Sequence, residues 1–113
     1  MNQSAEVPEI TATELKARLD ADDVPVLVDV REAFEKTIAD LPSVGQVNLP
    51  TGEFPQRIGE LERETELVVY CRSGSRSEWA ARMLIDAGFE RVWNLRGGVL
   101  AWRQDVDPTL QAY

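Results

Sequence analysis

The fold is decided by the stretch Leu67-Val68-Val69-Tyr70-Cys71-Arg72-Ser73-Gly74-Ser75-Arg76-Ser77-Glu78. Its first four residues are apolar or aromatic and predict a short strand buried on both faces, which is typical of parallel sheets. Its last four residues have the Ser-x-x-Glu spacing of a capping box with Ser75 as the cap, so a helix should begin at about Arg76. The stretch therefore predicts a strand, a tight loop that begins with a cysteine, and a helix.

A second apolar run in the first half of the chain, Pro25-Val26-Leu27-Val28-Asp29-Val30, predicts another buried strand. Asp29 and Arg31 stand at the carboxyl end of this run, just as Cys71 directly follows the strand expected at residues 67–70. The carboxyl ends of parallel strands meet at one edge of a sheet, and ligands bind beyond that edge. We therefore expect Asp29, Arg31 and Cys71 to lie on the same edge.

Strand-like and helix-like segments alternate through the rest of the chain. Further extended segments are expected at residues 9–10, 46–50 and 92–95. Helices are expected at residues 11–20, 32–39, 54–61, 78–87 and 99–102. The first should begin with a capping box, with Thr11 as the cap and Glu14 three residues later. The alternation predicts an α/β fold with a parallel sheet and helices on both faces. The tryptophans at positions 79, 93 and 102 are expected in the core.

Length and composition narrow the possible functions. The 113 residues are expected to form a single domain over residues 1–113, with a core at about 9–104 and a tail at 105–113. The chain has no histidine, which excludes a histidine base, a Ser–His–Asp triad and most transition-metal sites; no metal or cofactor is expected. A net charge of −8 argues against nucleic acid and anionic membranes as partners.

The compartment is indicated by the cysteine count and by the absence of targeting segments. Cys71 is the only cysteine, so no internal disulfide can form and the cytoplasm is expected. No apolar run is long enough for a transmembrane helix, and residues 1–9 lack the basic and apolar blocks of a signal peptide.

The loop after Cys71 has the composition of an anion-binding site. Gly74 permits a backbone conformation that lets successive N–H groups point inward and form a nest. The following helix adds a partial positive charge, and Arg72 and Arg76 add full charges. A lone cysteine after a buried strand is more often a small core residue. Here the glycine, the arginines and the serines at 73, 75 and 77 favour a stabilised, nucleophilic thiolate at Cys71.

Five blocks of the sequence, in this order and spacing, resemble the rhodanese-type sulfurtransferase domain. They are Val28-Asp29-Val30-Arg31-Glu32 with Glu35, Leu41-Pro42, Cys71 to Ser77, Ala87-Gly88-Phe89, and Leu95-Arg96-Gly97-Gly98-Val99-Leu100-Ala101-Trp102. The resemblance covers roughly residues 9–104. It implies a three-layer α/β sandwich around a mostly parallel five-stranded sheet. A weaker resemblance, at residues 49–54 and 106–113, is to the C-terminal rhodanese domain of molybdopterin-synthase adenylyltransferase/sulfurtransferase proteins.

The resemblance implies a sulfur-transfer reaction without a cofactor. Cys71 would accept a sulfane sulfur as a persulfide, and a nucleophilic acceptor would remove it. The substrate-binding loop would comprise Arg72, Ser73, Gly74, Ser75, Arg76 and Ser77. The implied donors are thiosulfate or a protein persulfide such as that of a cysteine desulfurase. The implied acceptors are cyanide, a thiol or a ubiquitin-like sulfur-carrier protein.

The roles of the charged residues around the loop are expected from their positions. Arg72 should face the entrance and attract an anionic donor, and Arg76 should anchor the end of the loop, with Asp29 as its candidate partner. Asp29 fits either a bracing acceptor or a substrate contact, and Arg31 fits a buried ion pair. The chain departs from the family where Asp40 replaces its usual histidine, where Ser43 replaces a glycine, and at residue 33, where alanine replaces a proline.

Other functions remain open on the sequence. A cysteine-dependent phosphatase or arsenate reductase also places a thiolate in an anion nest, but with five residues between the cysteine and the arginine, where this loop has four. Asp40 is a candidate general acid for that chemistry. A regulatory module typically lacks the cysteine that this chain retains. A redox-sensing thiol would need a partner outside the chain to resolve it.

Overall fold

A computed structural model describes residues 6–113. Most of residues 1–9, where no signal peptide is expected, therefore lies outside the described residues. The strands are β1 (Glu9–Ile10), β2 (Val26–Asp29), β3 (Val47–Asn48), β4 (Leu67–Tyr70) and β5 (Val92–Leu95). The α-helices are α1 (Ala12–Asp20), α2 (Phe54–Arg57), α3 (Ser75–Asp86) and α4 (Gly98–Asp105). Two 3-10 helices, η1 (Ala33–Thr37) and η2 (Ile58–Glu60), complete the order.

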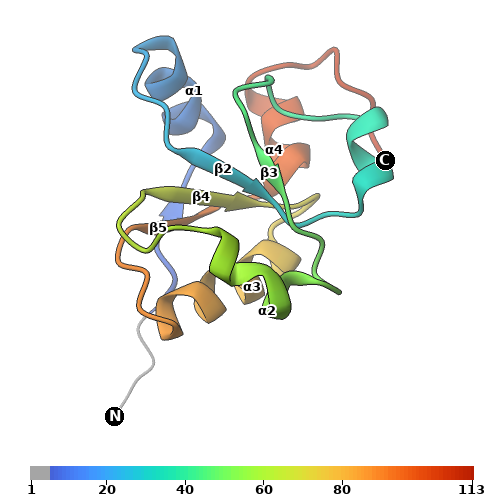
Figure 1. The fold of residues 1–113 in the computed structure, drawn as a ribbon. Helices are drawn as coiled ribbons and strands as arrows, with labels where there is room; N and C mark the ends of the chain where they lie inside the picture. The colour runs from blue at the N-terminus through green and yellow to red at the C-terminus, as the bar shows by residue number, and fades with distance from the viewer. Residues whose placement is uncertain (1–5) are drawn as a thin grey trace.

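The five strands form one sheet in the order β1-β5-β4-β2-β3, and all neighbouring pairs are parallel. In the register of the two central strands, Leu27 of β2 lies opposite Val68 of β4. The carboxyl ends of β2 and β4 therefore reach the same edge of the sheet (Figure 1). This confirms the predicted α/β class with a five-stranded sheet.

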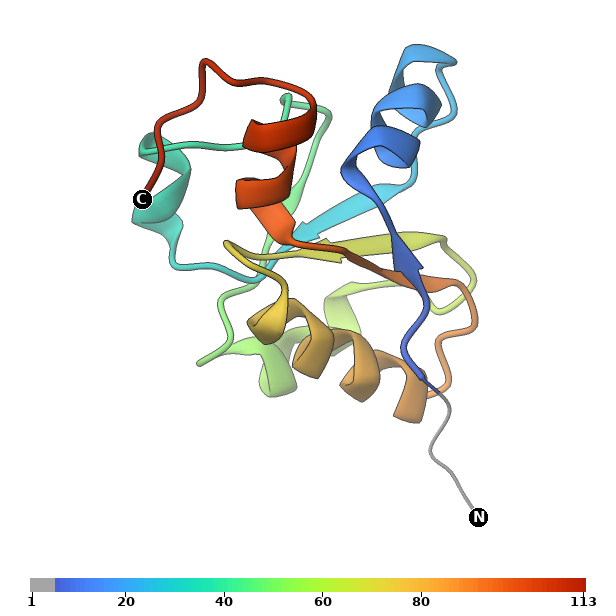
Figure 2. The ribbon, with the colours of Figure 1, turned by 180° about the vertical axis from the view of Figure 1, so that it is seen from behind.

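Helices cover both faces of the sheet, which gives three layers. Helices α1 and α4 pack on one face, and α2 and α3 lie on the other (Figures 1 and 2). Side chains alternate between the two resulting apolar layers, because successive residues of a strand point to opposite faces. Thus Val69 and Cys71 join the layer under α3, whereas Val68 and Tyr70 join the layer under α4.

Three local predictions differ from the structure. Helix α3 begins at Ser75 with Gly74 as its N-cap, so Ser75 is inside the helix and does not cap it with its side chain. The helix expected over 54–61 is broken into the four-residue α2 and the 3-10 helix η2, which contains Gly59, a poor helix former. The segment 32–39 forms only the 3-10 helix η1. By contrast, the capping box of Thr11 and Glu14 at the start of α1 is confirmed.

Two further regions depart from the expected core. Trp79 was expected inside, but it is 45% exposed and contacts the buried Phe54 ring at a centroid distance of 6.1 Å. The tail, which has no periodic pattern, packs Leu110 and Tyr113 against the apolar layer under α4. Its end lies beside η1 (Figures 1 and 2). None of the helices between residues 6 and 113 is long and apolar enough to span a bilayer.

Candidate active site

Cys71 lies immediately after β4, and its side chain is fully buried. The Cys71 Sγ atom accepts hydrogen bonds from the main-chain N–H groups of Gly74, at 3.1 Å, and Ser77, at 3.4 Å. Gly74 is the N-cap of α3 and Ser77 lies in its first turn, so the positive end of that helix faces the sulfur. Two N–H groups and a helix N-terminus together stabilise negative charge on this sulfur atom.

The curl of the loop depends on two glycines from different parts of the chain. Gly74 has a φ of +110°, a left-handed conformation that side chains disfavour. Gly98, at the start of α4, lies so close to the loop that an added Cβ would stand 2.3 Å from the carbonyl oxygen of Cys71. This approach lets the N–H groups of Val99 and Leu100 donate to the carbonyl oxygens of Cys71 and Arg72, both at 3.0 Å. Because these carbonyls bond to α4, they point away from the sulfur.

Ser77 and Asn94 form a buried polar pair under the loop. The Asn94 side-chain amide donates to the carbonyl oxygen of Gly74 at 3.2 Å, and its Oδ1 atom accepts from the Ser77 hydroxyl. The same hydroxyl lies 3.4 Å from Cys71 Sγ. It also lies 3.2 Å from the carbonyl oxygen of Gly74. A hydroxyl has one proton, so Ser77 can donate to only one of these three acceptors at a time. Asn94, on β5, thus braces the loop at Gly74 and gives the Ser77 proton an alternative acceptor.

Arg76 forms a bidentate salt bridge with Glu35 of η1, not with Asp29 as expected. Its two terminal nitrogens donate to the two Glu35 carboxylate oxygens at 2.8 and 3.1 Å. Hydrogen bonds from Arg76 lower the pKa of Glu35 to about 2, even though burial acts to raise it. The pKa of Arg76 is raised, first by Glu35 and also by the Cys71 thiolate. Arg76 therefore stays charged within electrostatic reach of the sulfur.

Asp29 is unavailable to Arg76 because it is bound to Arg31. The fully buried Arg31 donates to both Asp29 oxygens at 2.9 Å and to Asp40 Oδ1 at 3.0 Å. Asp40 Oδ1 also accepts from the Tyr70 hydroxyl and from the Leu41 N–H. Burial raises the pKa of Asp40, more than its hydrogen bonds lower it. Asp29 and Arg31 thus brace the edge of the sheet, and Asp40, a candidate general acid on the sequence, belongs to the same network.

The remaining loop residues face outward. The side chains of Arg72, Ser73 and Ser75 are exposed. Arg72 lies over the ring of Tyr113 at 5.3 Å from its centroid, and its Nε donates to the main-chain oxygen of that residue. A hollow of about 310 Å³ beside the loop is lined by Thr51, Ser75, Arg76 and Trp79. Within residues 6–113, no cluster of three or more acidic or cysteine side chains could hold a metal ion.

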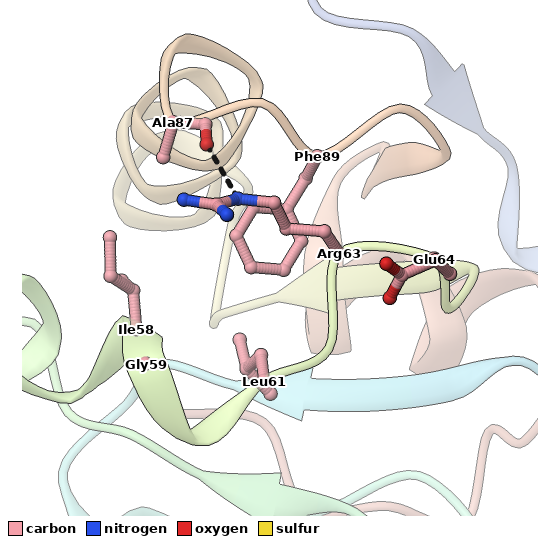
Figure 3. A pocket seen from close by; sticks show the side chains of 7 residues that line it. All are labelled: Ile58, Gly59, Leu61, Arg63, Glu64, Ala87 and Phe89. Atoms are coloured by element: carbon pink, nitrogen blue, oxygen red, sulfur yellow. Dashed lines mark hydrogen bonds between the residues drawn. The ribbon is translucent and has the colours of Figure 1, made fainter.

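A second hollow, of about 280 Å³, lies near the amino end of β4 (Figure 3). Its lining comes from the segment that precedes β4 and from the carboxyl end of α3. Arg63 extends across it, and its Nε donates to the carbonyl oxygen of Ala87 at 2.9 Å. The hollow is therefore at the opposite end of β4 and α3 from Cys71.

Three residues of the candidate site were missed by reasoning from the sequence: Glu35, Asn94 and Tyr113. Glu35 had a partial signal, since it stands in one of the blocks that carry the family resemblance. Asn94 is a polar residue in an otherwise apolar strand segment, a pattern that can mark a buried hydrogen-bonding role. Tyr113 had only a weak signal, because it ends a tail that has no periodicity and that carries only the weaker resemblance.

Comparisons with known proteins agree with this geometry. Residues 11–105 match the family described as rhodanese-like domain. A sulfurtransferase of Allochromatium vinosum is 42% identical over 97 residues, which cover 85% of this chain and 88% of that protein. The adenylyltransferase and sulfurtransferase MOCS3-2 of Zea mays is 34% identical across the whole chain, which spans only 24% of the maize protein.

The fold is also found among solved structures. The crystal structure of a rhodanese-related protein from Thermoplasma volcanium superposes with a TM-score of 0.77 at 27% identity, and covers 88% of this chain and 93% of that one. The family match, the sequence relatives and the shared fold are consistent with one another. The chain therefore belongs to the family of rhodanese-like domains.

Proposed function

We propose that the protein is a sulfurtransferase in which Cys71 carries the sulfur as a persulfide. The observation that carries this proposal is the pair of N–H groups, from Gly74 and Ser77, that converge on a single buried sulfur atom. Such donors lower the energy of an anionic sulfur in the way that an oxyanion hole stabilises an anionic oxygen. A relative that covers most of this chain is named a sulfurtransferase.

The first half-reaction loads the sulfur. With thiosulfate as donor, the Cys71 thiolate attacks the outer, sulfane sulfur and forms the new S–S bond. The S–S bond of thiosulfate breaks, and sulfite leaves with the electron pair. Arg76 lies within electrostatic reach of Cys71 and would attract the dianionic donor. With a protein persulfide as donor, such as that of a cysteine desulfurase, a thiolate leaves in place of sulfite.

The second half-reaction transfers the sulfur from Cys71 to an acceptor. A nucleophile attacks the outer sulfur of the Cys71 persulfide, the S–S bond breaks, and the thiolate leaves with the electron pair. Cyanide or a thiol would serve as such a nucleophile. A ubiquitin-like sulfur carrier would instead react through an activated acyl group at its C-terminus: the outer persulfide sulfur attacks that carbonyl carbon, and the activating group leaves. Two thiols then reduce the acyl disulfide, which releases the carrier thiocarboxylate and the Cys71 thiolate and leaves the two thiols joined as a disulfide. We favour the carrier as acceptor because this chain is similar to the maize adenylyltransferase and sulfurtransferase. The chain spans about a quarter of that protein.

The test is the intact mass of the protein after incubation with thiosulfate and removal of excess donor. We expect a gain of one sulfur atom, which cyanide then removes with release of thiocyanate. The matched control is Cys71→Ser, which should gain no sulfur. A wild-type protein that gained no sulfur either from thiosulfate or from a protein persulfide would overturn the proposal. So would hydrolysis of p-nitrophenyl phosphate at a comparable rate that is lost in Cys71→Ser, which would favour phosphatase chemistry instead.

A further inference from the structure

Tyr113 connects the two arginines that flank the active-site loop. Its ring and its main-chain oxygen contact Arg72, the first residue of the loop. Its hydroxyl donates to Glu35 at 3.0 Å and accepts from the buried Arg31 at 2.8 Å. Glu35 in turn binds Arg76, at the other end of the loop. A residue of the tail, which lies outside the five blocks of the rhodanese resemblance, thus contacts both sides of the loop.

The contacts leave part of Arg72 free to meet a ligand. Its Nε atom is used by the main-chain oxygen of Tyr113, and its guanidinium plane lies over the ring. Its two terminal nitrogens have no hydrogen-bond partner within residues 6–113. An arginine held by a ring and one hydrogen bond loses much of its rotamer freedom before a ligand arrives. The charge is therefore held in one place, on an exposed residue whose two terminal nitrogens can still donate to a ligand.

Through Arg72, Tyr113 is linked to the residue next to the reacting sulfur. Arg72 directly follows Cys71 in the chain. A cation fixed at this point attracts anions to the loop and has little effect on neutral reagents.

We propose that Tyr113 is a positioning residue that sets the preference of Cys71 for anionic over neutral reagents, through its hold on Arg72. This deepens the proposed function, since thiosulfate and persulfides are anions. The ring and main-chain oxygen hold Arg72. The hydroxyl serves a separate purpose, because it joins Arg31 and Glu35.

Two variants separate these contributions. Tyr113→Phe keeps the ring over Arg72 and loses only the hydroxyl bonds to Arg31 and Glu35. Tyr113→Leu loses both the ring and the hydroxyl. If the ring positions Arg72, the phenylalanine variant should behave like the wild type in its charge preference, and the leucine variant should not.

The experiment compares the rates at which iodoacetate and iodoacetamide alkylate Cys71. The two reagents react by the same displacement at carbon and differ by one negative charge. In Tyr113→Leu the ratio of the iodoacetate rate to the iodoacetamide rate should fall by about threefold or more at low ionic strength, and this difference should shrink with added salt. In Tyr113→Phe the ratio should stay at the wild-type value. The KM for thiosulfate should rise in Tyr113→Leu alone.

A double-mutant cycle excludes a general loss of structure. In an Arg72→Gln background, Tyr113→Leu should leave the reagent ratio unchanged, because the residue through which it acts is gone. An equal fall with and without Arg72 would overturn the proposal, as would an unchanged ratio in Tyr113→Leu or an equal loss in Tyr113→Phe. Alkylation needs only the thiol. Failure of this inference is therefore distinguishable from failure of the sulfur-transfer proposal, which the thiosulfate mass measurement tests.

Discussion

The two ends of helix α3 are surrounded by different groups. At the amino end, the N–H groups of Gly74 and Ser77 converge on Cys71, and Arg76 adds a full charge that Glu35 holds in place. At the carboxyl end, Arg63 donates to the carbonyl oxygen of Ala87 beside an open hollow (Figure 3). A helix has partial positive charge at its first end and partial negative charge at its last. Arg63 therefore lies where the helix dipole favours a cation, whereas Arg76 lies at the positive end and is held there by the Glu35 carboxylate.

The comparison shows that the size of a hollow is a poor guide to chemistry in this molecule. The hollow by Arg63 and the hollow beside the loop have similar volumes, about 280 and 310 Å³. Only the loop brings several donors onto one buried nucleophile. At the other end, the guanidinium is occupied by a helix carbonyl, and Ile58, Leu61 and Phe89 form the apolar wall. The proposed function places the reaction at the amino end of α3, whereas the carboxyl end has the contacts of an ordinary helix terminus.

The largest expected effect comes from removing the nucleophile. Cys71→Ser should reduce thiosulfate-to-cyanide sulfur transfer to background, because the chain has no other cysteine to hold a persulfide. The fold should survive, since serine is of similar size and the loop bonds lie in the main chain. Activity and far-ultraviolet circular dichroism are the measurements. Transfer that persists in a folded Cys71→Ser protein would show that the amino end of α3 is not the reactive one.

Gly98→Ala should unfold or strongly destabilise the protein. The added methyl group would meet the Cys71 carbonyl oxygen at 2.3 Å, at a φ of +58° that disfavours a side chain. We expect a loss of about 4 kcal/mol in the free energy of unfolding from overpacking and backbone strain combined. Urea denaturation measures it. The control is Gly59→Ala, whose added methyl group meets nothing within 4 Å. A similar loss in both variants would contradict a special packing of α4 against the loop.

Glu35→Gln should destabilise the protein at neutral pH and less so in acid. The folded-state pKa of Glu35 is lowered from 4.5 to about 2, chiefly by Arg76, so the carboxylate contributes stability above pH 4.5. That contribution is lost as the pH falls from 4.5 to 2. The Arg76 side chain is 34% exposed, so water solvates its charge when the ion pair is lost. We therefore expect Glu35→Gln to lower the free energy of unfolding by only about 2 kcal/mol.

The measurement is denaturation of both proteins at pH 7 and over the acid range. The difference between wild type and Glu35→Gln should shrink toward low pH. A difference that stays constant with pH would mean that the Glu35–Arg76 bridge is not the source of the stability.

The smallest effect is expected at the other end of α3. Arg63→Met keeps much of the apolar stem and removes the hydrogen bond to Ala87. The cost should be below about 1 kcal/mol, as is usual for an exposed contact at a helix end. The rate of sulfur transfer and the alkylation of Cys71 should not change. A marked loss of transfer in Arg63→Met would show that the hollow in Figure 3 takes part in function.

Features that depend on neighbours in the chain were predicted well. The buried strands, the cap of α1 at Thr11 and the turn from β4 through a short loop into α3 each arise from a few consecutive residues. The α/β class followed from their alternation. The start of α3 was misplaced by one residue because Gly74, through its left-handed conformation, replaces Ser75 as the cap.

The sequence by itself determined the order of strands and helices, and that the single cysteine begins a short, cationic, glycine-containing loop. Only the tertiary structure decided which charges meet. Arg76 binds Glu35, 41 residues away, because Arg31 already occupies Asp29. Tyr113 reaches Arg31 across 82 residues. Periodicity and capping patterns report on the nearest turn of the chain, whereas an ion pair depends on which side chains the sheet brings to the same edge. Packing decides which ion pairs form, because a buried charge is stable only beside an oppositely charged or hydrogen-bonding group that the fold places within reach.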